Sequence, residues 1–515
     1  MKNEKIILKE KFFSLRKEMH EKKQRVVLCH GVYDLLHYGH IEHLKEAKSQ
    51  GDILVVSVTA GRFVNKGPGR PYFSDQQRME FLASLEFVDY VLLSEDITVH
   101  EIVRFVRPDI YVKGQEYENA QNDITGNIDS EQAVVEEYGG KIYFTKGKVF
   151  SSTKLLNNYF NALPDGVEAV SQQLKDKYGN NISEKMRGDI EKFKNLKVLV
   201  VGDVIIDDYV FCKVQGLTGK DGILSTRYDF EERYAGGSLA IARHIANFSD
   251  NVGLCSMIGM EHEFYPYIEN ALQKISFEIV KEAGFITPVK RRFLKLHPQR
   301  QEYDKLFSIN MLLNDKQVNQ VNYDNFYKKL ENIIEDYDLV VVCDYGHGLI
   351  TKEAIGILES KAKFLAINCQ TNSANYGMNL ITKYKRADMF VVDERELRLA
   401  FQQSLTERDV LLKKLVQHFE SFYGGWVTVG AEGAIGYKES EQLKIPAVTL
   451  HVKDTVGAGD AFYALAALCA VNNFPIDIAT LISNTAGAIK TNLVGNSKSV
   501  EKVDLLKFLS TILNV

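Results

Sequence analysis

Residues 25–58 read RVVLCHGVYDLLHYGHIEHLKEAKSQGDILVVSV, and this stretch decides the fold of the first part of the chain. The apolar runs 25–30 and 52–58 predict two buried strands. Between them, after a loop, residues 41–50 have the apolar spacing of a helix. A strand, a helix and a second strand in this order predict parallel strands joined by a right-handed crossover.

The same alternation continues along the chain. Further helices are predicted over 77–85 and 100–108, and further strands over 88–94, 109–114, 197–207, 338–346, 363–370, 388–394 and 424–433. The polar stretch 161–194 carries no strand signal and predicts a helical linker. We therefore expect an α/β protein with a Rossmann-like domain over 1–160 and a larger α/β domain over 195–515.

Composition and charge narrow the class of protein. The chain has 515 residues, of which 45% are hydrophobic and 25% charged, which favours two or more globular domains. Its formal net charge of −5 makes nucleic acid and anionic membranes unexpected partners. The start of the chain lacks the apolar core of a signal peptide, and the six scattered cysteines form no CxxC pair. These features favour a cytoplasmic enzyme without a zinc site or disulfides.

Two histidines mark the first candidate site. His37 and His40 precede the helix predicted over 41–50, and the preceding strand ends near His30 and Gly31. Free N–H groups at a helix amino terminus favour a phosphate, and imidazoles can donate hydrogen bonds to phosphoryl oxygens. Gly39 permits a ligand to approach the backbone closely. The pattern predicts phosphate chemistry at the start of this helix.

Other phosphate-binding residue types follow in order along this part of the chain. Lys66 lies in the loop KGPGRP, and the strand DIYVKG ends in Lys113. The run Ser151, Ser152 and Thr153 precedes another helix and offers hydroxyl and N–H donors. Together these residues predict a site for a nucleoside triphosphate.

On these motifs, residues 25–160 resemble cytidylyltransferase-type nucleotidyltransferases, and in particular the adenylyltransferase half of bifunctional heptose-activating enzymes. The resemblance implies that His37, His40 and Lys66 stabilise the α-phosphorus while a sugar phosphate displaces pyrophosphate, with Mg2+ bridging the triphosphate. It implies a nucleotide-binding role for His30, Gly31, Tyr33, Gly39, Lys113, Ser151, Ser152 and Thr153. The motifs leave the choice between ATP and CTP open.

The second candidate site lies near the carboxyl end, in KDTVGAGDAFYALAALCA over 453–470. A glycine-rich turn runs directly into an apolar helix, so the N–H groups of Gly457, Ala458 and Gly459 can form an anion hole. Asp460 lies beside that hole and can accept the proton of an attacking hydroxyl. A base and a set of N–H donors together predict phosphoryl transfer to an alcohol.

Two earlier segments agree with that prediction. GDVIIDDY over 202–209 contains Asp203 and Asp207, and YAGGSLAIARHIA over 234–246 contains Gly236 and Gly237. With these motifs, residues 196–515 resemble the ribokinase family of PfkB-type carbohydrate kinases. The resemblance implies a ribokinase-like domain with a small β lid. Its implied roles are Asp460 as base, Asp203, Asp207, Gly236 and Gly237 at the sugar, and Thr428, Gly430, Gly433, Gly457, Ala458, Gly459 and Asn484 at the nucleotide.

The same resemblance implies a metal near Asp454 and Glu396, Mg2+ and ATP, potassium in the kinase domain, and a homodimer formed through a lid over 210–233. The chain departs from these families in four respects. Ala240 stands where the family has asparagine, and 215–234 differs from the heptose kinases. The asparagine-rich stretch 368–379 also departs from the family and either lines the ligand or forms a loop. The order of the two domains is the reverse of the heptose enzyme.

These observations favour two consecutive steps of sugar activation for surface polysaccharide synthesis. The kinase would phosphorylate a heptose-like sugar at C1, and the transferase would join a nucleotide to that phosphate. Ala240 motivates a second hypothesis, in which a CTP-dependent transferase acts on a polyol phosphate. A third hypothesis is that one domain, the kinase in particular, serves only binding or dimerisation. The sequence leaves open the sugar, its anomer, any channelling between the sites and the oligomeric state.

Overall fold

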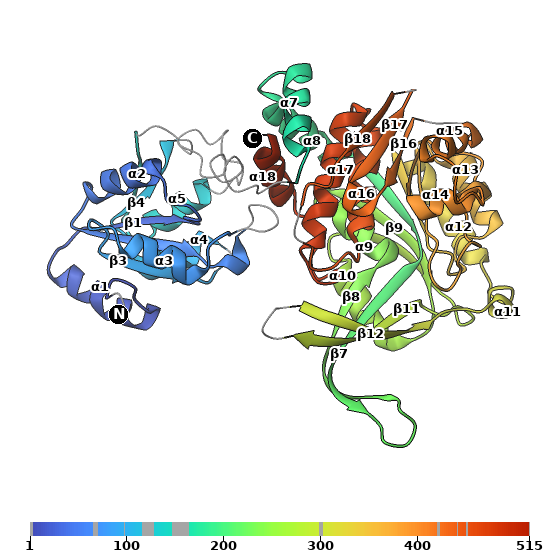
Figure 1. Cartoon of the computed structure of the whole chain (residues 1–515), viewed down its shortest axis with the longest axis horizontal. Helices are drawn as coiled ribbons and strands as arrows, with labels where there is room; N and C mark the ends of the chain where they lie inside the picture. Colours follow the sequence, from blue (N-terminus) through green and yellow to red (C-terminus); the bar gives the residue numbers. More distant parts are fainter. Residues whose placement is uncertain are drawn as a thin grey trace. The chain divides into compact units, whose positions relative to one another are not determined.

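The computed structural model describes residues 4–64, 71–96, 98–115, 128–146, 164–297, 302–419, 423–439, 441–449 and 452–513. The chain divides into two compact units, one of residues Met1–Leu163 with Leu506–Val515 and one of residues Pro164–Leu505 (Figure 1). Each unit contains its own wholly or mostly parallel sheet and its own buried core. The α/β class predicted from the sequence is confirmed.

The first unit is built on a parallel five-stranded sheet in the order β3-β2-β1-β4-β5. Its strands are β1 (Val26–Gly31), β2 (Ile53–Thr59), β3 (Tyr90–Ser94), β4 (Ile110–Lys113) and β5 (Lys141–Phe144). The order reverses at β1, which has β2 on one side and β4 on the other. A crevice at the carboxyl ends of these strands is where such sheets bind ligands.

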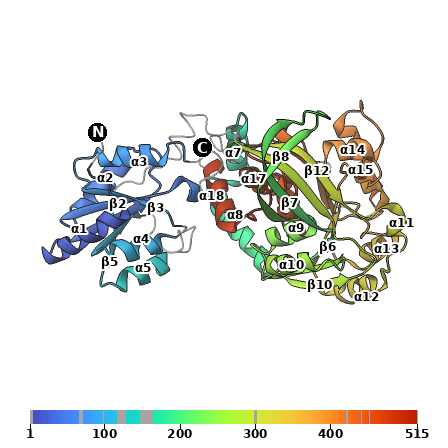
Figure 2. The same cartoon turned by 90° about the horizontal axis from the view of Figure 1, so that it is seen from below.

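Helices cover both faces of this sheet (Figure 2). The helices α2 (Tyr38–Lys48) and α3 (Asp75–Ala83) share one hydrophobic core with it. The helices α1 (Lys9–Glu21), α4 (Val99–Val106) and α5 (Ile128–Glu136) share a second core on the other face. Burial on both faces explains why the strands are nearly continuous apolar runs.

The second unit has a nine-stranded sheet in the order β10-β9-β6-β13-β14-β15-β16-β17-β18. Its strands are β6 (Lys197–Gly202), β9 (Asn251–Ile258), β10 (Ser276–Lys281), β13 (Leu339–Asp344), β14 (Leu365–Cys369), β15 (Met389–Asp393), β16 (Gly424–Thr428), β17 (Ala434–Lys438) and β18 (Glu441–Ile445). The strands from β10 to β16 are parallel, and β17 and β18 are antiparallel. Polar residues at the carboxyl ends of the parallel strands therefore meet at one edge.

A separate four-stranded sheet, here called the lid sheet, has the order β12-β11-β7-β8. Its strands are β7 (Val204–Leu217), β8 (Leu224–Gly236), β11 (Val289–His297) and β12 (Glu302–Met311). The single strand predicted over 197–207 is thus divided, because β6 ends at Gly202 and the chain turns into β7. Figure 1 shows β7 and β8 extending away from the nine-stranded sheet as a hairpin.

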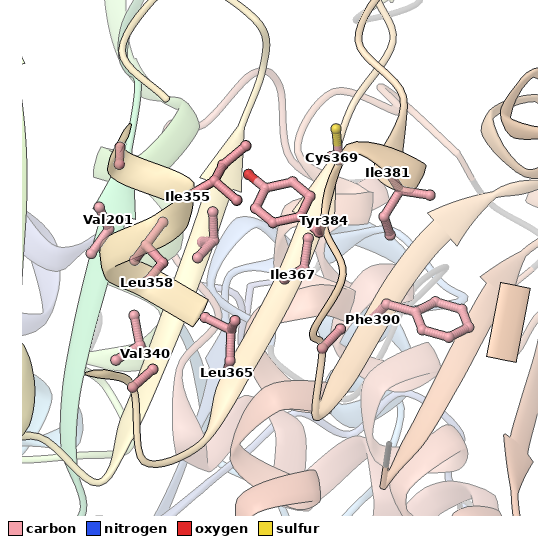
Figure 3. Packing of buried hydrophobic residues seen from close by; sticks show 14 of the residues in the cluster. Val201, Val340, Ile355, Leu358, Leu365, Ile367, Cys369, Ile381, Tyr384 and Phe390 are labelled. Carbon is pink, nitrogen blue, oxygen red and sulfur yellow. The ribbon is translucent and has the colours of Figure 1, made fainter. Parts of the chain in front are cut away.

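The second unit also contains helices, the last of them only in part. They are α7 (Val167–Tyr178), α8 (Ile182–Glu191), α9 (Gly237–Ile245), α10 (Tyr265–Ala271), α11 (Asp315–Val318), α12 (Asp324–Ile333), α13 (Lys352–Lys361), α14 (Glu394–Ala400), α15 (Arg408–His418), α16 (Ala458–Val471), α17 (Ile476–Thr491) and α18 (Lys502–Leu513), which crosses the boundary between the units. Figure 3 shows Ile355 and Leu358 of α13 packed over Val340 and Leu365 of the sheet.

The stretch predicted as a helical linker forms α7 and α8 and clusters with the second unit. Lys177 forms an ion pair with Asp477 of α17 at 2.7 Å, and the Tyr178 hydroxyl donates to the same carboxylate at 2.9 Å. These contacts fix α7 to the second unit. The domain bounds 1–160, 161–194 and 195–515 stay a prediction.

All six cysteines are buried free thiols. Among the described residues, none of the helices has the length and apolar character that crossing a membrane requires.

Candidate active sites

The two predicted histidines lie together at the start of α2. His37 is the N-cap of that helix, and its ring stacks on the ring of His40 with centroids 4.0 Å apart. Tyr33 meets His40 edge to face at 5.4 Å. Because β1 ends at the reversal point of the sheet, this cluster lies where the fold favours a bound ligand. Both imidazoles are thus placed at a helix amino terminus that can accept phosphate.

His30 and Lys113 are held by neighbouring strands and helices. The His30 ring nitrogens lie 2.7 Å from the Ser57 hydroxyl and 3.2 Å from the Thr59 hydroxyl. Burial, with a smaller effect of Lys113, lowers the pKa of His30 to about 3, so this ring stays neutral. Lys113 forms a 2.6 Å ion pair with Glu131 of α5. The described contacts of both side chains therefore fix the ends of β1 and β4.

A fully buried arginine that the sequence argument missed organises the loop before the histidines. Arg78 of α3 donates to the Val32 carbonyl at 2.6 Å and to the Thr59 carbonyl at 2.9 Å. It also forms a 2.6 Å ion pair with Asp75. One guanidinium thus joins the loop after β1 to the end of β2. Its only sequence signal is an arginine on the apolar face of a predicted helix.

The loop that carries Lys66 lies outside the described residues, and so do Ser151, Ser152 and Thr153. The segment that follows the Lys66 loop is described. Its backbone N–H groups at Tyr72 and Phe73 donate to the buried Asp34 carboxylate at 2.6 and 3.1 Å. Asp34 belongs to the histidine-bearing segment, so the end of the Lys66 loop is tied to that segment.

The second predicted site gathers around Asp460, which lies in the first turn of α16. Its carboxylate accepts a hydrogen bond from the Tyr345 hydroxyl at 2.8 Å and from the Gln370 amide at 3.4 Å. Gly457 caps α16 with a φ of +79°. A Cβ added at Gly459 would meet no atom of the described residues within 4 Å. The turn therefore leaves space beside the carboxylate at Gly459, while the backbone N–H of Ala458 donates to the Thr455 carbonyl at 3.3 Å.

Asp203 is linked to Asp460 through the same tyrosine. One oxygen of the buried Asp203 carboxylate accepts the backbone N–H of Tyr345 at 3.1 Å and that of His347 at 3.4 Å. The other, Oδ1, is buried without a partner among the described residues. Burial and then the charge of Asp344 raise the pKa of Asp203 to about 7. An unsatisfied carboxylate oxygen in this position can accept a sugar hydroxyl.

The two glycines before α9 are required by close contacts. A Cβ at Gly236 would lie 2.5 Å from the Asp207 carboxylate, and one at Gly237 would lie 2.3 Å from the Asp203 carbonyl. Gly237 also has a φ of +57°, which disfavours any other residue. The glycines therefore let the start of α9 approach both aspartates. The structure brings Asp203, Asp207, the di-glycine and Asp460 into one site.

Cationic side chains of the lid sheet complete this site and were missed by the sequence argument. Arg292 of β11 forms an ion pair with Asp207. Lys290 lies over the Tyr345 ring at 5.6 Å, and burial lowers its pKa. The available signal was the spacing of Lys290 and Arg292 in VKRRF over 289–293, because residues two apart on a strand face the same side.

The asparagine-rich stretch 368–379 supports the turn that carries Tyr345. The side-chain amides of Asn372 and Asn375 both donate to the Tyr345 carbonyl at 2.8 Å. Asn379 donates to the Asp344 carboxylate at 3.1 Å. Of this stretch, Gln370 alone is described in contact with Asp460. The asparagines therefore act as turn-stabilising residues, and Gln370 faces the reacting groups.

Four of the residues predicted to bind the nucleotide, Thr428, Gly430, Gly433 and Asn484, lie near the strands β16 to β18. Thr428 ends β16, and Gly430 opens the turn to β17 with a φ of +55°. A Cβ on Gly433 would lie 2.1 Å from the Ile445 carbonyl. Asn484 of α17 donates to the Pro446 carbonyl at 2.6 Å, which holds the chain after β18. Their contact with a nucleotide stays a prediction.

The carboxylates of the two residues predicted near a metal already accept hydrogen bonds from protein donors. The Asp454 carboxylate accepts the Tyr209 hydroxyl at 3.2 Å and the backbone N–H groups of Gly495 and Val456 at 2.9 and 3.2 Å, and Lys305 lies 3.4 Å away.

Glu396 accepts the backbone N–H groups of Asp393 at 2.9 Å and Thr371 at 3.0 Å, and burial raises its pKa to about 8. In the described part of the chain, no group of three or more histidine, cysteine or acidic residues could hold a metal. A metal role for Asp454 and Glu396 stays a prediction.

Comparison with protein families gives one match in each part of the chain. Residues 28–183 match the cytidylyltransferase-like family, and residues 298–503 match the pfkB family of carbohydrate kinases. The chain thus joins a cytidylyltransferase-like domain at its amino end to a pfkB-type carbohydrate kinase domain at its carboxyl end. The resemblance to these two families, in this order along the chain, is confirmed.

The chain is similar to proteins named bifunctional protein HldE. The one from Nitratiruptor sp. is 37% identical over 129 residues, which cover 25% of this chain and 28% of the relative. The one from Campylobacter fetus is 26% identical over 314 residues, 59% of this chain and 64% of the relative. The chain spans less than two thirds of the length of these relatives. Among solved structures, ribokinase from Thermotoga maritima is 16% identical, with a TM-score of 0.46 covering 61% of this chain and 99% of that one.

Proposed function

We propose that the chain is a bifunctional sugar-activating enzyme that makes a nucleotide-sugar and pyrophosphate. The carboxyl-terminal domain phosphorylates a heptose-like sugar at C1, and the amino-terminal domain transfers a nucleotidyl group from ATP or CTP to that phosphate. The observation that carries the proposal is the bridge from Asp203 through Tyr345 to Asp460 at the glycine turn of α16.

In the kinase reaction, Asp460 accepts the proton of the sugar hydroxyl while the hydroxyl oxygen attacks the γ-phosphorus of ATP. The bond from that phosphorus to the bridging oxygen breaks, and ADP leaves. The free oxygen of Asp203 and the carboxylate of Asp207 orient the sugar. The N–H groups of Gly457 to Gly459 receive the charge on the transferred phosphoryl group.

In the transferase reaction, an oxygen of the sugar phosphate attacks the α-phosphorus of the nucleoside triphosphate. The bond from the α-phosphorus to the bridging oxygen breaks, and pyrophosphate leaves. Phosphate is already a nucleophile, so a general base is not required. His37 and His40 donate to the phosphoryl oxygens, and Lys66 is proposed to contact the triphosphate.

Magnesium supplies charge neutralisation to the phosphates in both reactions. A magnesium ion bound to nucleotide phosphates keeps several waters and needs few protein ligands. Asp454 and Glu396 would hold such an ion only through its waters, because protein donors occupy both carboxylates in this structure. The absence of a three-ligand cluster in the described residues is compatible with this mode of binding.

The relatives named HldE and the two matching families support a sugar as acceptor. A second acceptor class is a polyol phosphate used with CTP, which would form a CDP-polyol. Ala240 favours it, because this buried apolar residue of α9 takes a position at the sugar side. Product identity distinguishes the two classes.

A homodimer through the lid sheet is part of the proposal. Exposed apolar side chains of this sheet support it, namely Leu217, Leu224, Tyr228, Phe307 and Ile309. Exposed apolar side chains of this size commonly mark contact surfaces. The free buried thiols support a reducing compartment such as the cytoplasm.

A product screen tests the proposal. The full chain is incubated with ATP or CTP and a panel of heptoses, hexoses and polyols, free and phosphorylated, and products are identified by mass spectrometry. We expect ADP, pyrophosphate and a nucleotide-sugar. Asp460→Asn should abolish ADP release and leave nucleotidyl transfer to a supplied sugar phosphate intact, and His37→Ala should do the reverse. Failure to release ADP or pyrophosphate from any acceptor would refute the proposal.

A further inference from the structure

A fully buried lysine lies near the carboxyl end of α17, outside the predicted motifs. Lys490 has no exposed surface, and its ammonium donates to the Gly495 carbonyl. Among the described residues, no carboxylate lies within ion-pair distance of this ammonium. Burying an ammonium with one neutral acceptor is costly unless negative charge is brought near it. Its position indicates which negative charge that is.

The lysine side chain lies directly beneath the anion hole. A Cβ added at Gly457 would lie 3.1 Å from Cε of Lys490 and 2.2 Å from the side-chain oxygen of Asn496. Gly457 is the N-cap of α16, and Asp460 lies in the first turn of that helix. The positive charge of Lys490 is therefore built into the floor of the turn that receives the transferred phosphoryl group.

The surrounding charges keep this ammonium protonated. Burial lowers the pKa of Lys490 to about 8, while Asp454, Asp460 and Asp207 act in the opposite direction. A pKa of about 8 leaves most of the side chain charged at pH 7. The arrangement therefore holds a cation in place before any substrate binds, which is the condition for preorganised stabilisation of charge.

The potassium ion implied by the ribokinase resemblance does not fit beside this turn. A monovalent cation needs several oxygen ligands. The Gly495 carbonyl accepts from Lys490, and the Asp454 carboxylate accepts from Tyr209 and two backbone N–H groups and lies beside Lys305. The side-chain oxygen of Asn496 is buried and has no partner in the described part of the chain. Protein donors thus already use the Gly495 carbonyl and the Asp454 carboxylate, and the Lys490 ammonium itself supplies a positive charge beside them.

We infer that Lys490 is a positioning residue that supplies, from the chain itself, the positive charge beneath the anion hole, so that the kinase reaction of this protein is independent of potassium. The inference rests on the proposed kinase function. On this inference, the free-energy cost of burying the ammonium is offset when the ammonium stabilises the charge on the transferred phosphoryl group. It also replaces the expectation of potassium in the kinase domain.

The test compares wild type, Lys490→Met, Lys490→Ala and the matched control Lys305→Met in the full chain. Lys305 is a half-exposed lysine beside Asp454. ADP release is measured in potassium-free buffer, and then with potassium chloride, sodium chloride or methylammonium chloride. The rate of ADP release by wild type should change less than twofold when potassium is added. Lys490→Met should lose about 100-fold in kcat with little change in KM, which is the scale of losing one oxyanion-stabilising group.

Lys490→Ala, with its smaller side chain, should recover part of its activity with potassium or methylammonium. The fold-loss of kcat in Lys305→Met should be at least tenfold smaller than that in Lys490→Met. A merely structural lysine would not produce rescue by a small cation. Wild-type activation of more than tenfold by potassium would overturn the inference, as would a folded Lys490→Met variant within twofold of wild type.

A second readout separates this inference from the proposed function. Thermal unfolding of wild type should respond equally to potassium and sodium, whereas Lys490→Ala should gain a rise in Tm specific to potassium. If no acceptor yields ADP, the proposed function fails and this readout still decides the inference. A potassium-specific rise in the Tm of wild type would refute it.

Discussion

Replacing Tyr345 by phenylalanine removes one hydroxyl from the kinase site and leaves the rest of the residue in place. That hydroxyl donates to the Asp460 carboxylate at 2.8 Å, while the Tyr345 backbone N–H still binds Asp203. Burial raises the pKa of Asp460, and the hydrogen bond from Tyr345 opposes that rise. Losing the hydroxyl should therefore make the proposed base harder to ionise.

The size of the effect on Asp460 follows from the hydrogen bond that is lost. A hydrogen bond to a charged group contributes about 1.5 to 3 kcal/mol. Its loss should therefore raise the pKa of Asp460 further above its usual value. The acidic limb of the kcat/KM profile for ADP release should move to higher pH. The rate below that limb should fall about 10- to 100-fold, and the plateau at higher pH should change little.

The assay is ADP release across the pH range with the acceptor found in the product screen. Tyr463→Phe is the matched control, since Tyr463 lies on α16 and its hydroxyl donates to the neutral Val342 carbonyl at 2.9 Å. It should lower stability by about 1 kcal/mol and leave the limb in place. An unchanged limb in Tyr345→Phe, or an equal displacement in Tyr463→Phe, would refute the assignment of Asp460 as the base.

Three further results are expected. Arg78→Met should destabilise the amino-terminal domain by about 1 to 3 kcal/mol, because the Val32, Thr59 and Phe73 carbonyls and the partly exposed Asp75 lose their donor, and urea unfolding measures this; a loss below about 0.5 kcal/mol would contradict it. Gly433→Ala should cost more than about 1 kcal/mol and raise the KM for ATP, because its φ is +96° and the new Cβ would strike the Ile445 carbonyl. The pKa of Asp203 rises from 3.8 to about 7 on folding, so wild type should lose stability relative to Asp203→Asn as pH rises from about 4 to 7; parallel curves would exclude this.

The fold class and the location of both sites followed from local patterns in the sequence. Apolar runs of four to seven residues alternating with amphipathic helices predict a parallel sheet, because both of its faces must be buried. The glycine turns at the starts of α9 and α16 could be recognised from the sequence, because few residues tolerate a positive φ or such close contacts. The division of the strand predicted over 197–207 was not legible, since every residue from 198 to 206 except Gly202 and Asp203 is apolar.

The sequence by itself determined the α/β architecture, the two helix amino termini that can hold phosphate, and the aspartates and histidines placed beside them. Only the tertiary structure decided which groups surround those residues. Tyr345 and Gln370 follow the ends of β13 and β14, Lys490 lies on α17, and nothing in their local patterns marks them. Local propensity reports the conformation of a segment, whereas hydrogen bonds and buried charges depend on which distant segments the sheet order brings together.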